Sequence, residues 1–273
     1  FMEKEFYKSL KSKTLNDIAN GRVTYDKLDN ILREDKEIVL EAIRHESFVY
    51  YDVPKSLKDD REIVIASLKK YGLMLEFVSD ELKKDREIVF TAVKQCGFAL
   101  KYADKIFKED KEIVYEAIKS DGWALQFVGR RFLRDPNFLF TAVKYHGYAF
   151  ELLPKKYKRD RNFIEKCIKV HAYILRFLEP KIKKNYLFLE KLIKINGYCL
   201  QYIPDEFKDD FNLSILAVKQ NGLSISFVEG DLRKNKKIII EAIKRNRESY
   251  DFIDSSMKLD KDVNAAFMKY SMV

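Results

Sequence analysis

The chain contains few of the residues on which covalent or metal-based stabilisation depends. Its 273 residues include only three cysteines, Cys96, Cys167 and Cys199, whose spacing fits neither a metal site nor a disulfide framework. We therefore expect reduced thiols that behave as small buried apolar residues. Nine glycines and five prolines are too few for a collagen-like or disordered chain.

Long apolar segments and catalytic signatures are missing as well. No stretch reaches the roughly 18 apolar residues of a membrane-spanning helix, and the residues after Met2 do not form an apolar signal-peptide core. There is no glycine-rich phosphate loop, no GxSxG elbow, and no HExxH or CxxC motif. We expect no enzyme, no cofactor and no membrane insertion. The expected location is cytoplasmic, in the producing cell or, for an effector, in a host cell.

What the sequence does contain is a 25-residue repeat that runs from residue 35 to the C-terminus without an insertion or deletion. Each copy begins with Asp or Asn, and we number repeat positions from that residue. The first positions are Asp35, Asp60, Asp85, Asp110, Asp135, Asp160, Asn185, Asp210, Asn235 and Asp260. A short fixed period indicates a solenoid, in which each unit buries its apolar face against its neighbours.

The copy that begins at Asp85 shows how one repeat is built. Asp85 is a good N-cap, and Ile88, Val89, Ala92 and Val93 have the spacing of one helix face. Gly97 is expected to end this helix in the left-handed conformation. The second half should form a short helix over about residues 98–103. Its expected buried side chains are Leu100, Tyr102, Ala103 and Phe107.

The predicted fold class is all-α, an α-solenoid of nine to ten 25-residue two-helix repeats. Residues 1–34 break the register, and we interpret them as an atypical N-terminal cap. Residues 35–273 are expected to form one continuous domain. The unit length is similar to that of leucine-rich-variant repeats, which is an analogy of fold alone.

The repeat pattern Asp-Lys/Arg-Glu-Ile-Val-x-x-Ala-Val/Ile-Lys-x-x-Gly-x-Ala-Leu-x-Phe/Tyr-Val resembles the 4116 family of uncharacterised repeat domains. The copies at Asp85 and Asp110 match closely, for example in Gly122-Trp-Ala-Leu-Gln-Phe-Val. The copies from Asp135 to Asn185 depart from the pattern, because they lack the Glu at position 3. The resemblance implies a repeat fold and a microbial interaction protein, and it supplies no catalytic residues.

The formal net charge of +9 is concentrated in the middle of the chain, where residues 130–184 hold 15 Lys or Arg and five Asp or Glu. Residues 25 apart stack in a solenoid, so the cations of successive inter-repeat turns should form one basic strip. They are Arg130, Arg131, Arg134, Lys155, Lys156, Lys158, Arg159, Arg161, Lys181, Lys183 and Lys184. Such a strip favours an acidic protein surface, a nucleoprotein complex or a nucleic acid; the alternative is a solvated face. The Lys or Arg at position 10 of every copy has a structural explanation, because it lies at a helix C-terminus.

Apolar residues accompany the strip. Tyr186 and Phe211 stand at position 2, where most copies have Lys or Arg. The usually polar position 11 carries Tyr145, Val170 and Ile195, which would form an interaction patch unless a helix tilt buries them. His146 and His171 share position 12, and we expect surface histidines there and no metal site.

The expected function is a non-catalytic scaffold that docks on a macromolecular partner, as an effector or inhibitor. The eleven strip cations, Tyr145, Tyr186 and Phe211 are the candidate partner-binding residues. An RNA- or DNA-binding module that uses the strip is the alternative, and an enzyme with an unrecognised site is the third class.

Overall fold

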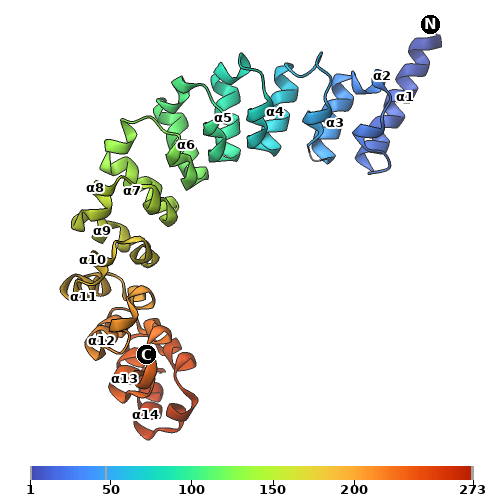
Figure 1. Cartoon of the computed structure of the whole chain (residues 1–273). Coiled ribbons are helices and arrows are strands. Elements are labelled where there is room, and N and C mark those ends of the chain that lie inside the picture. Colours follow the sequence, from blue (N-terminus) through green and yellow to red (C-terminus); the bar gives the residue numbers. More distant parts are fainter. Residues whose placement is uncertain (1, 47, 272–273) are drawn as a thin grey trace. The chain divides into compact units, whose positions relative to one another are not determined.

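The computed structural model describes residues 2–46 and 48–271, and these ranges contain helices and no strand (Figure 1). The predicted all-α repeat architecture is confirmed. The chain divides into two compact units, Phe1–Asp135 and Pro136–Val273, which we describe one at a time. None of the helices in the described ranges combines the length and the apolar character needed to cross a bilayer.

Each repeat of the first unit begins with a ten-residue α-helix, and shorter 3-10 helices (η) follow it. In chain order the elements of this unit are α1 (Met2–Ala19), η1 (Tyr25–Lys27), α2 (Asn30–Arg33), α3 (Lys36–His45), η2 (Val49–Asp52), α4 (Arg61–Lys70), η3 (Gly72–Phe77), η4 (Leu82–Lys84), α5 (Arg86–Gln95), η5 (Gly97–Lys101), η6 (Lys105–Lys108), α6 (Lys111–Ser120), η7 (Gly122–Gln126) and η8 (Phe132–Arg134).

The second unit has the same order of elements, and two of its turns contain short α-helices. Its elements are α7 (Pro136–Tyr145), η9 (Gly147–Leu152), α8 (Lys155–Arg159), α9 (Arg161–Ile168), η10 (Ala172–Phe177), α10 (Pro180–Lys183), α11 (Tyr186–Ile195), η11 (Gly197–Tyr202), η12 (Asp205–Phe207), α12 (Phe211–Gln220), η13 (Gly222–Phe227), η14 (Gly230–Lys234), α13 (Lys236–Arg245), η15 (Arg247–Phe252), η16 (Ser255–Leu259) and α14 (Lys261–Ser271).

The helices begin where the N-cap residues predict. The Asp85 carboxylate accepts hydrogen bonds from the backbone amides of Glu87 at 2.9 Å and Ile88 at 3.2 Å. Equivalent caps are formed by Asp35, Asp60, Asp110, Asp160, Asn185, Asp210, Asn235 and Asp260. These side chains satisfy amides that have no partner within the helix.

Within each unit the α-helices stack in one layer and the 3-10 helices in a second; α5 contacts α4 and α6, and η5 contacts η3 and η7. The predicted helix core is confirmed, because Ile88, Val89, Ala92 and Val93 are fully buried. The predicted second helix is a 3-10 helix. Its buried set is corrected at one position: Ala99 is buried and Tyr102 is half-buried.

The prediction that Gly97 ends its helix in a left-handed conformation is wrong. Gly97 is not among the residues with positive φ; it begins η5, where a Cβ would collide with the carbonyl oxygen of Ala117 in the next α-helix. In the second unit a Cβ on Gly222 would lie 2.5 Å from the carbonyl oxygen of Ala242. Glycine is needed here because one repeat packs directly against the backbone of the next.

Helix α1 covers the exposed side of the first repeat. Lys11 Nζ lies 2.9 Å from an Asp35 carboxylate oxygen and 2.8 Å from a Glu37 carboxylate oxygen. The buried Tyr25 donates its hydroxyl hydrogen to the backbone carbonyl of Arg33 at 2.7 Å, and burial raises its pKa to about 12. The cap therefore uses contacts of the same kind as those between repeats.

Ion pairs link the repeats of the first unit along the edge where the α-helices begin. The cation at position 2 lies between the acids at positions 1 and 3 of the next repeat; Arg61 is 3.2 Å from Asp85 and 2.5 Å from Glu87. The same contacts join Lys36 to Asp60 and Glu62, and Arg86 to Asp110 and Glu112. We call this series the ion-pair ladder. Burial opposes ionisation of Asp85, but Arg61 and the helix amides outweigh it and hold the Asp85 pKa below its ordinary value.

Side chains at position 11 cap the C-terminal ends of the preceding α-helices. Gln95 Nε2 donates to the carbonyl of Lys70 at 3.1 Å, and its Oε1 accepts from the amide of Gly72 at 2.6 Å. In the second unit Gln220 makes the same two bonds to the preceding repeat. The C-termini of α4 and α11 are thus completed by a residue of the following repeat.

Candidate binding surface

Two successive turns of the second unit, at α8 and α10, carry most of the predicted basic residues (Figure 1). Arg159 Nε lies 2.9 Å from Glu179 Oε1, immediately before α10, so the two turns are neighbours. Lys155, Lys156 and Lys181 are exposed on them. Stacking therefore brings together these parts of the strip.

Two of the predicted lysines have a structural explanation. Lys158 Nζ donates to the carbonyl of Glu151 at 2.9 Å, and Lys183 Nζ donates to the carbonyl of Arg176 at 3.4 Å. The same bond recurs at Lys58, Lys108 and Lys208. A lysine at this position binds carbonyls at the end of a 3-10 helix in both units, so the repeat fold accounts for Lys158 and Lys183.

Four lysines of these turns remain available to a partner. Within residues 2–46 and 48–271, Lys155 and Lys181 make no ion pair. Lys156 Nζ lies 5.5 Å from the centroid of the Tyr157 ring. Lys184 Nζ lies 3.7 Å from Glu206 Oε2, which is a long distance for an ion pair. We call Lys155, Lys156, Lys181 and Lys184 the basic edge.

The ion-pair ladder is interrupted beside the basic edge. Arg161 holds position 2, but the next repeat offers Asn185 and Leu187 where the acids would be. The Arg161 guanidinium lies instead 5.0 Å from the centroid of the Phe188 ring. Leu187 is 76% exposed in the first turn of α11. The sequence shows Leu187 where the first four copies have Glu, but Leu187 was not among the predicted binding residues.

Tyr186 and Phe211 lie on the same edge but differ in their surroundings. Tyr186 is half-buried; its hydroxyl donates to Asp210 at 3.2 Å, and its ring centroid is 5.9 Å from that of Phe207. Burial, followed by the charge of Asp210, raises the Tyr186 pKa. Tyr186 therefore replaces a ladder cation and has a structural role, whereas Phe211 is 37% exposed.

Tyr145 does not lie on this edge. It ends α7, and a ten-residue helix is about 15 Å long, so Tyr145 belongs to the edge where the α-helices end. Tyr145 is 50% exposed, Val170 is 40% exposed and Ile195 is half-buried. The predicted apolar patch is thus partly exposed, and it is separate from the basic edge.

Arg130, Arg131 and Arg134 form the last turn of the first unit, and all three are exposed. Arg131 Nε lies 3.1 Å from Glu109 Oε2, and its guanidinium is 4.8 Å from the centroid of the Phe132 ring. Because these three arginines belong to the first unit, we define the basic edge by residues of the second unit alone.

The histidines and cysteines have surroundings that the fold explains. His171 Nε2 lies 3.1 Å from the carbonyl oxygen of Lys144, at a helix end. Burial raises the pKa of the Cys167 and Cys199 thiols to about 12, and Cys96 is half-buried. In the part of the chain that the structure describes, no three His, Cys, Asp or Glu side chains are grouped to hold a metal.

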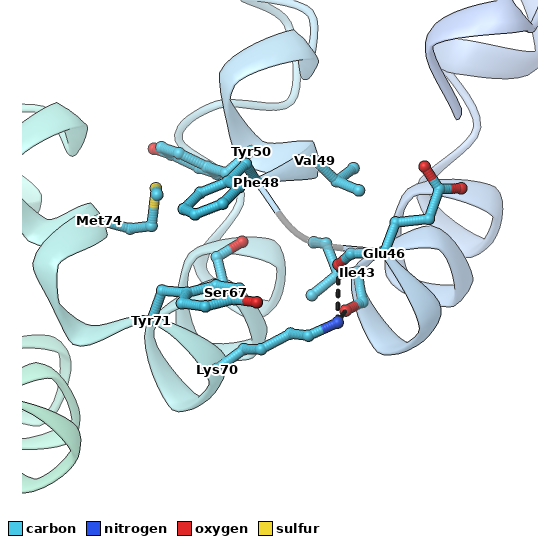
Figure 2. A pocket seen from close by; sticks show the side chains of 9 residues that line it. All are labelled: Ile43, Glu46, Phe48, Val49, Tyr50, Ser67, Lys70, Tyr71 and Met74. Carbon is cyan, nitrogen blue, oxygen red and sulfur yellow. Dashed lines mark hydrogen bonds between the residues drawn. The ribbon is translucent and has the colours of Figure 1, made fainter. Parts of the chain in front are cut away.

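Figure 2 shows a small pocket in the first unit, between α3 and α4. Lys70 Nζ donates there to the carbonyls of Ile43 at 2.9 Å and Glu46 at 2.7 Å. The Phe48 ring stacks on Tyr71 with a centroid distance of 4.9 Å. The lysine amine acts as a cap for the end of α3, so the fold accounts for its position.

One family model matches successive pairs of repeats through most of the chain. The family, described as Domain of unknown function (DUF4116), matches residues 35–83, 60–108, 85–133, 110–158, 135–183, 185–233 and 213–258. The chain belongs to the DUF4116 family. Five DUF4116 matches begin 25 residues apart, from residue 35 to residue 135, in step with the repeat. No curated protein and no solved structure matches the chain.

Proposed function

We propose that the protein is a non-catalytic docking scaffold whose basic edge binds an acidic surface of a partner protein. The observation that carries this proposal is the side-by-side exposure of Lys155, Lys156 and Lys181 without a carboxylate partner among the described residues. Like charges held close together repel one another, and an acidic partner relieves this repulsion. Surface lysines that only maintain solubility would not need to be grouped on adjacent turns.

The distribution of charge supports the proposal. Residues 1–135 contain 26 Lys or Arg and 26 Asp or Glu, whereas residues 136–273 contain 26 and 17. The whole net charge of the chain therefore lies in the second unit. A field of one sign accelerates association with an oppositely charged partner and aligns it on the charged surface.

The cellular role that follows from this proposal is that of an effector or inhibitor, because a scaffold without catalysis acts by occupying the surface of its partner. The free cysteines favour a reducing, cytoplasmic compartment for this binding.

The test is a charge reversal at Lys155, Lys156 and Lys181, each changed to Glu in one variant. Poly-L-glutamate binding, measured by fluorescence anisotropy over a salt series, should weaken about tenfold or more. The control reverses Lys69, Lys94 and Lys219, which lie at position 10, and it changes the net charge equally. The control should retain most of the binding, and both variants should melt as folded proteins. Equal losses would show that the probe senses only overall charge.

Nucleic-acid binding is the second candidate, because an exposed lysine cluster beside the exposed Arg161 also suits a phosphate backbone. A single-stranded oligouridine decides between the two. Tighter binding of oligouridine than of poly-L-glutamate, with a steep salt dependence, would favour the nucleic acid.

A further inference from the structure

The strongest clue to the chemistry of the partner is the break in the ion-pair ladder at Arg161. Lys236, in the same unit, keeps the usual arrangement and lies 2.9 Å from Asp260 and 2.7 Å from Asp262. Among the position-2 cations that another repeat follows, Arg161 alone has no acid at either place. Its exposed guanidinium is held over the Phe188 ring and is free to bind a carboxylate from outside the chain.

Leu187 is the second part of this clue. The first turn of an α-helix favours an acidic side chain, because its free amides carry partial positive charge. Leucine at this place, 76% exposed, contributes little to the fold and leaves apolar surface in water. Phe211, the next position-2 residue, is also exposed. The apolar surface and the exposed cations thus lie on one edge of the second unit.

We propose that Arg161 and Leu187 extend the basic edge into a site for an acidic protein segment that carries an aliphatic side chain among its carboxylates. This inference rests on the proposed function and specifies its partner. Arg161, Lys181 and Lys184 bind the carboxylates, and Leu187 covers the aliphatic side chain. The charges of site and ligand are complementary, and the ligand removes the exposed leucine from water.

The composition of the site favours a protein over a nucleic acid. Bases bind single-stranded sites by stacking on exposed aromatic rings. Of the two rings next to Leu187 in the chain, that of Phe188 is buried beside the Arg161 guanidinium. That of Tyr186 packs against Phe207 and is held through its hydroxyl by Asp210. An exposed leucine instead suits an aliphatic side chain, because its surface is apolar and has no flat face.

The decisive variant is Leu187→Glu, which restores the acid of the ladder. The new carboxylate can pair with Arg161 as Glu87 pairs with Arg61 at 2.5 Å. The melting temperature should therefore stay the same or rise, while the site loses its aliphatic surface and its unpaired cation. Loss of binding in a protein that is at least as stable cannot be attributed to misfolding.

The probes are two synthetic peptides and an oligouridine. One peptide repeats Glu-Glu-Leu-Leu, and the other repeats Glu-Glu-Ser-Ser with the same charge. The leucine peptide should bind the wild-type protein about tenfold or more tightly than the serine peptide, the range expected for burying one leucine. Leu187→Glu should remove this preference, and Leu187→Ser should reduce it without adding charge. Ser255→Glu, an exposed control in the same unit, should preserve it.

Three results would overturn the inference. They are equal binding of the two peptides, an unchanged preference in Leu187→Glu, and tighter binding of oligouridine than of the leucine peptide. The failure of the inference is distinguishable from failure of the proposed function. Suppose that Lys155, Lys156 and Lys181 are still required for poly-L-glutamate binding while Leu187 is not required for the peptide preference. The proposed function is then supported, and the proposed aliphatic site is rejected.

Discussion

The two units are built from the same repeat but differ along the edge where their α-helices begin. In the first unit Glu62, Glu87 and Glu112 complete the ion-pair ladder. In the second unit the equivalent position holds Asn137, Asn162, Leu187, Asn212, Lys237 and Asp262. The buried positions, N-caps and glycine contacts recur in both units. Exposed ion pairs contribute little stability, so this edge can change its chemistry without loss of the fold.

The largest effect should come from a feature that the two units share. Gly97→Ala is expected to cost about 2–3 kcal/mol of unfolding free energy, because its Cβ would overlap the Ala117 carbonyl. Gly222→Ala should cost a similar amount through Ala242. Urea denaturation measures both values. A loss below about 0.5 kcal/mol, the usual size for a surface change, would show that the repeats do not pack this closely.

A smaller difference in unfolding free energy is expected between N-cap variants of the two units. Asp85→Ala removes a cap and the carboxylate that Arg61 contacts, so it should cost about 1–2 kcal/mol. Asn185→Ala removes a cap alone and should cost about 1 kcal/mol. Urea denaturation in low and high salt provides the comparison, since salt should weaken only the Asp85 effect. Equal costs with equal salt dependence would mean that the ladder adds nothing.

The lysine that binds carbonyls should behave alike in both units. Lys108→Met and Lys158→Met each lose a bond to a backbone carbonyl, of 3.0 Å and 2.9 Å, and should cost about 0.5–1 kcal/mol. Thermal melts measure the cost, and poly-L-glutamate binding should change little in either variant. A large binding loss confined to Lys158→Met would show that Lys158 contributes to partner binding.

The smallest effect is the response of the ladder to acid. Burial opposes ionisation of Asp60 and Asp85, but their ion pairs and amide bonds hold the pKa of both carboxyls below the ordinary value. A lowered folded-state pKa adds stability above the unfolded-state pKa, near 3.9, and that stability is lost as the pH falls through the folded-state pKa. Melting temperatures should therefore drop below about pH 4. Arg61→Ala should reduce this drop; an identical acid profile would exclude the pairing.

The repeat period, the N-caps and the helix core were predictable because each depends on local spacing that every copy repeats. Asp85 as a cap and Ile88 to Val93 as a buried face follow directly from helix geometry. The role of Gly97 was not predictable, because a glycine that ends a helix and one that allows a neighbour to approach have the same local sequence. Only the position of Ala117 in the next repeat distinguishes them.

The candidate surface was predictable in part. Stacking at a fixed period placed Lys156 and Lys181 on neighbouring turns, as the Arg159–Glu179 contact shows. Charge counts could not reveal that Lys158 is bound to a carbonyl within its own repeat. The place of Tyr145 at the end of its helix was predictable, because position 11 follows the position already assigned to the helix C-terminus.

The bonds made by Gln95 have a consequence for how such chains can be cut and joined. Gln95 supplies both partners that the end of the preceding repeat needs, at Lys70 and at Gly72. The segment that must stay intact therefore does not run from one N-cap to the next. It extends from Gly72 to Gln95, at the end of the α-helix of the following copy. A chimera joined between Gly72 and Gln95 would separate donors from acceptors that were matched to each other. A join that keeps such a pair together should allow whole repeats to be exchanged between chains, including the repeats that carry the basic edge.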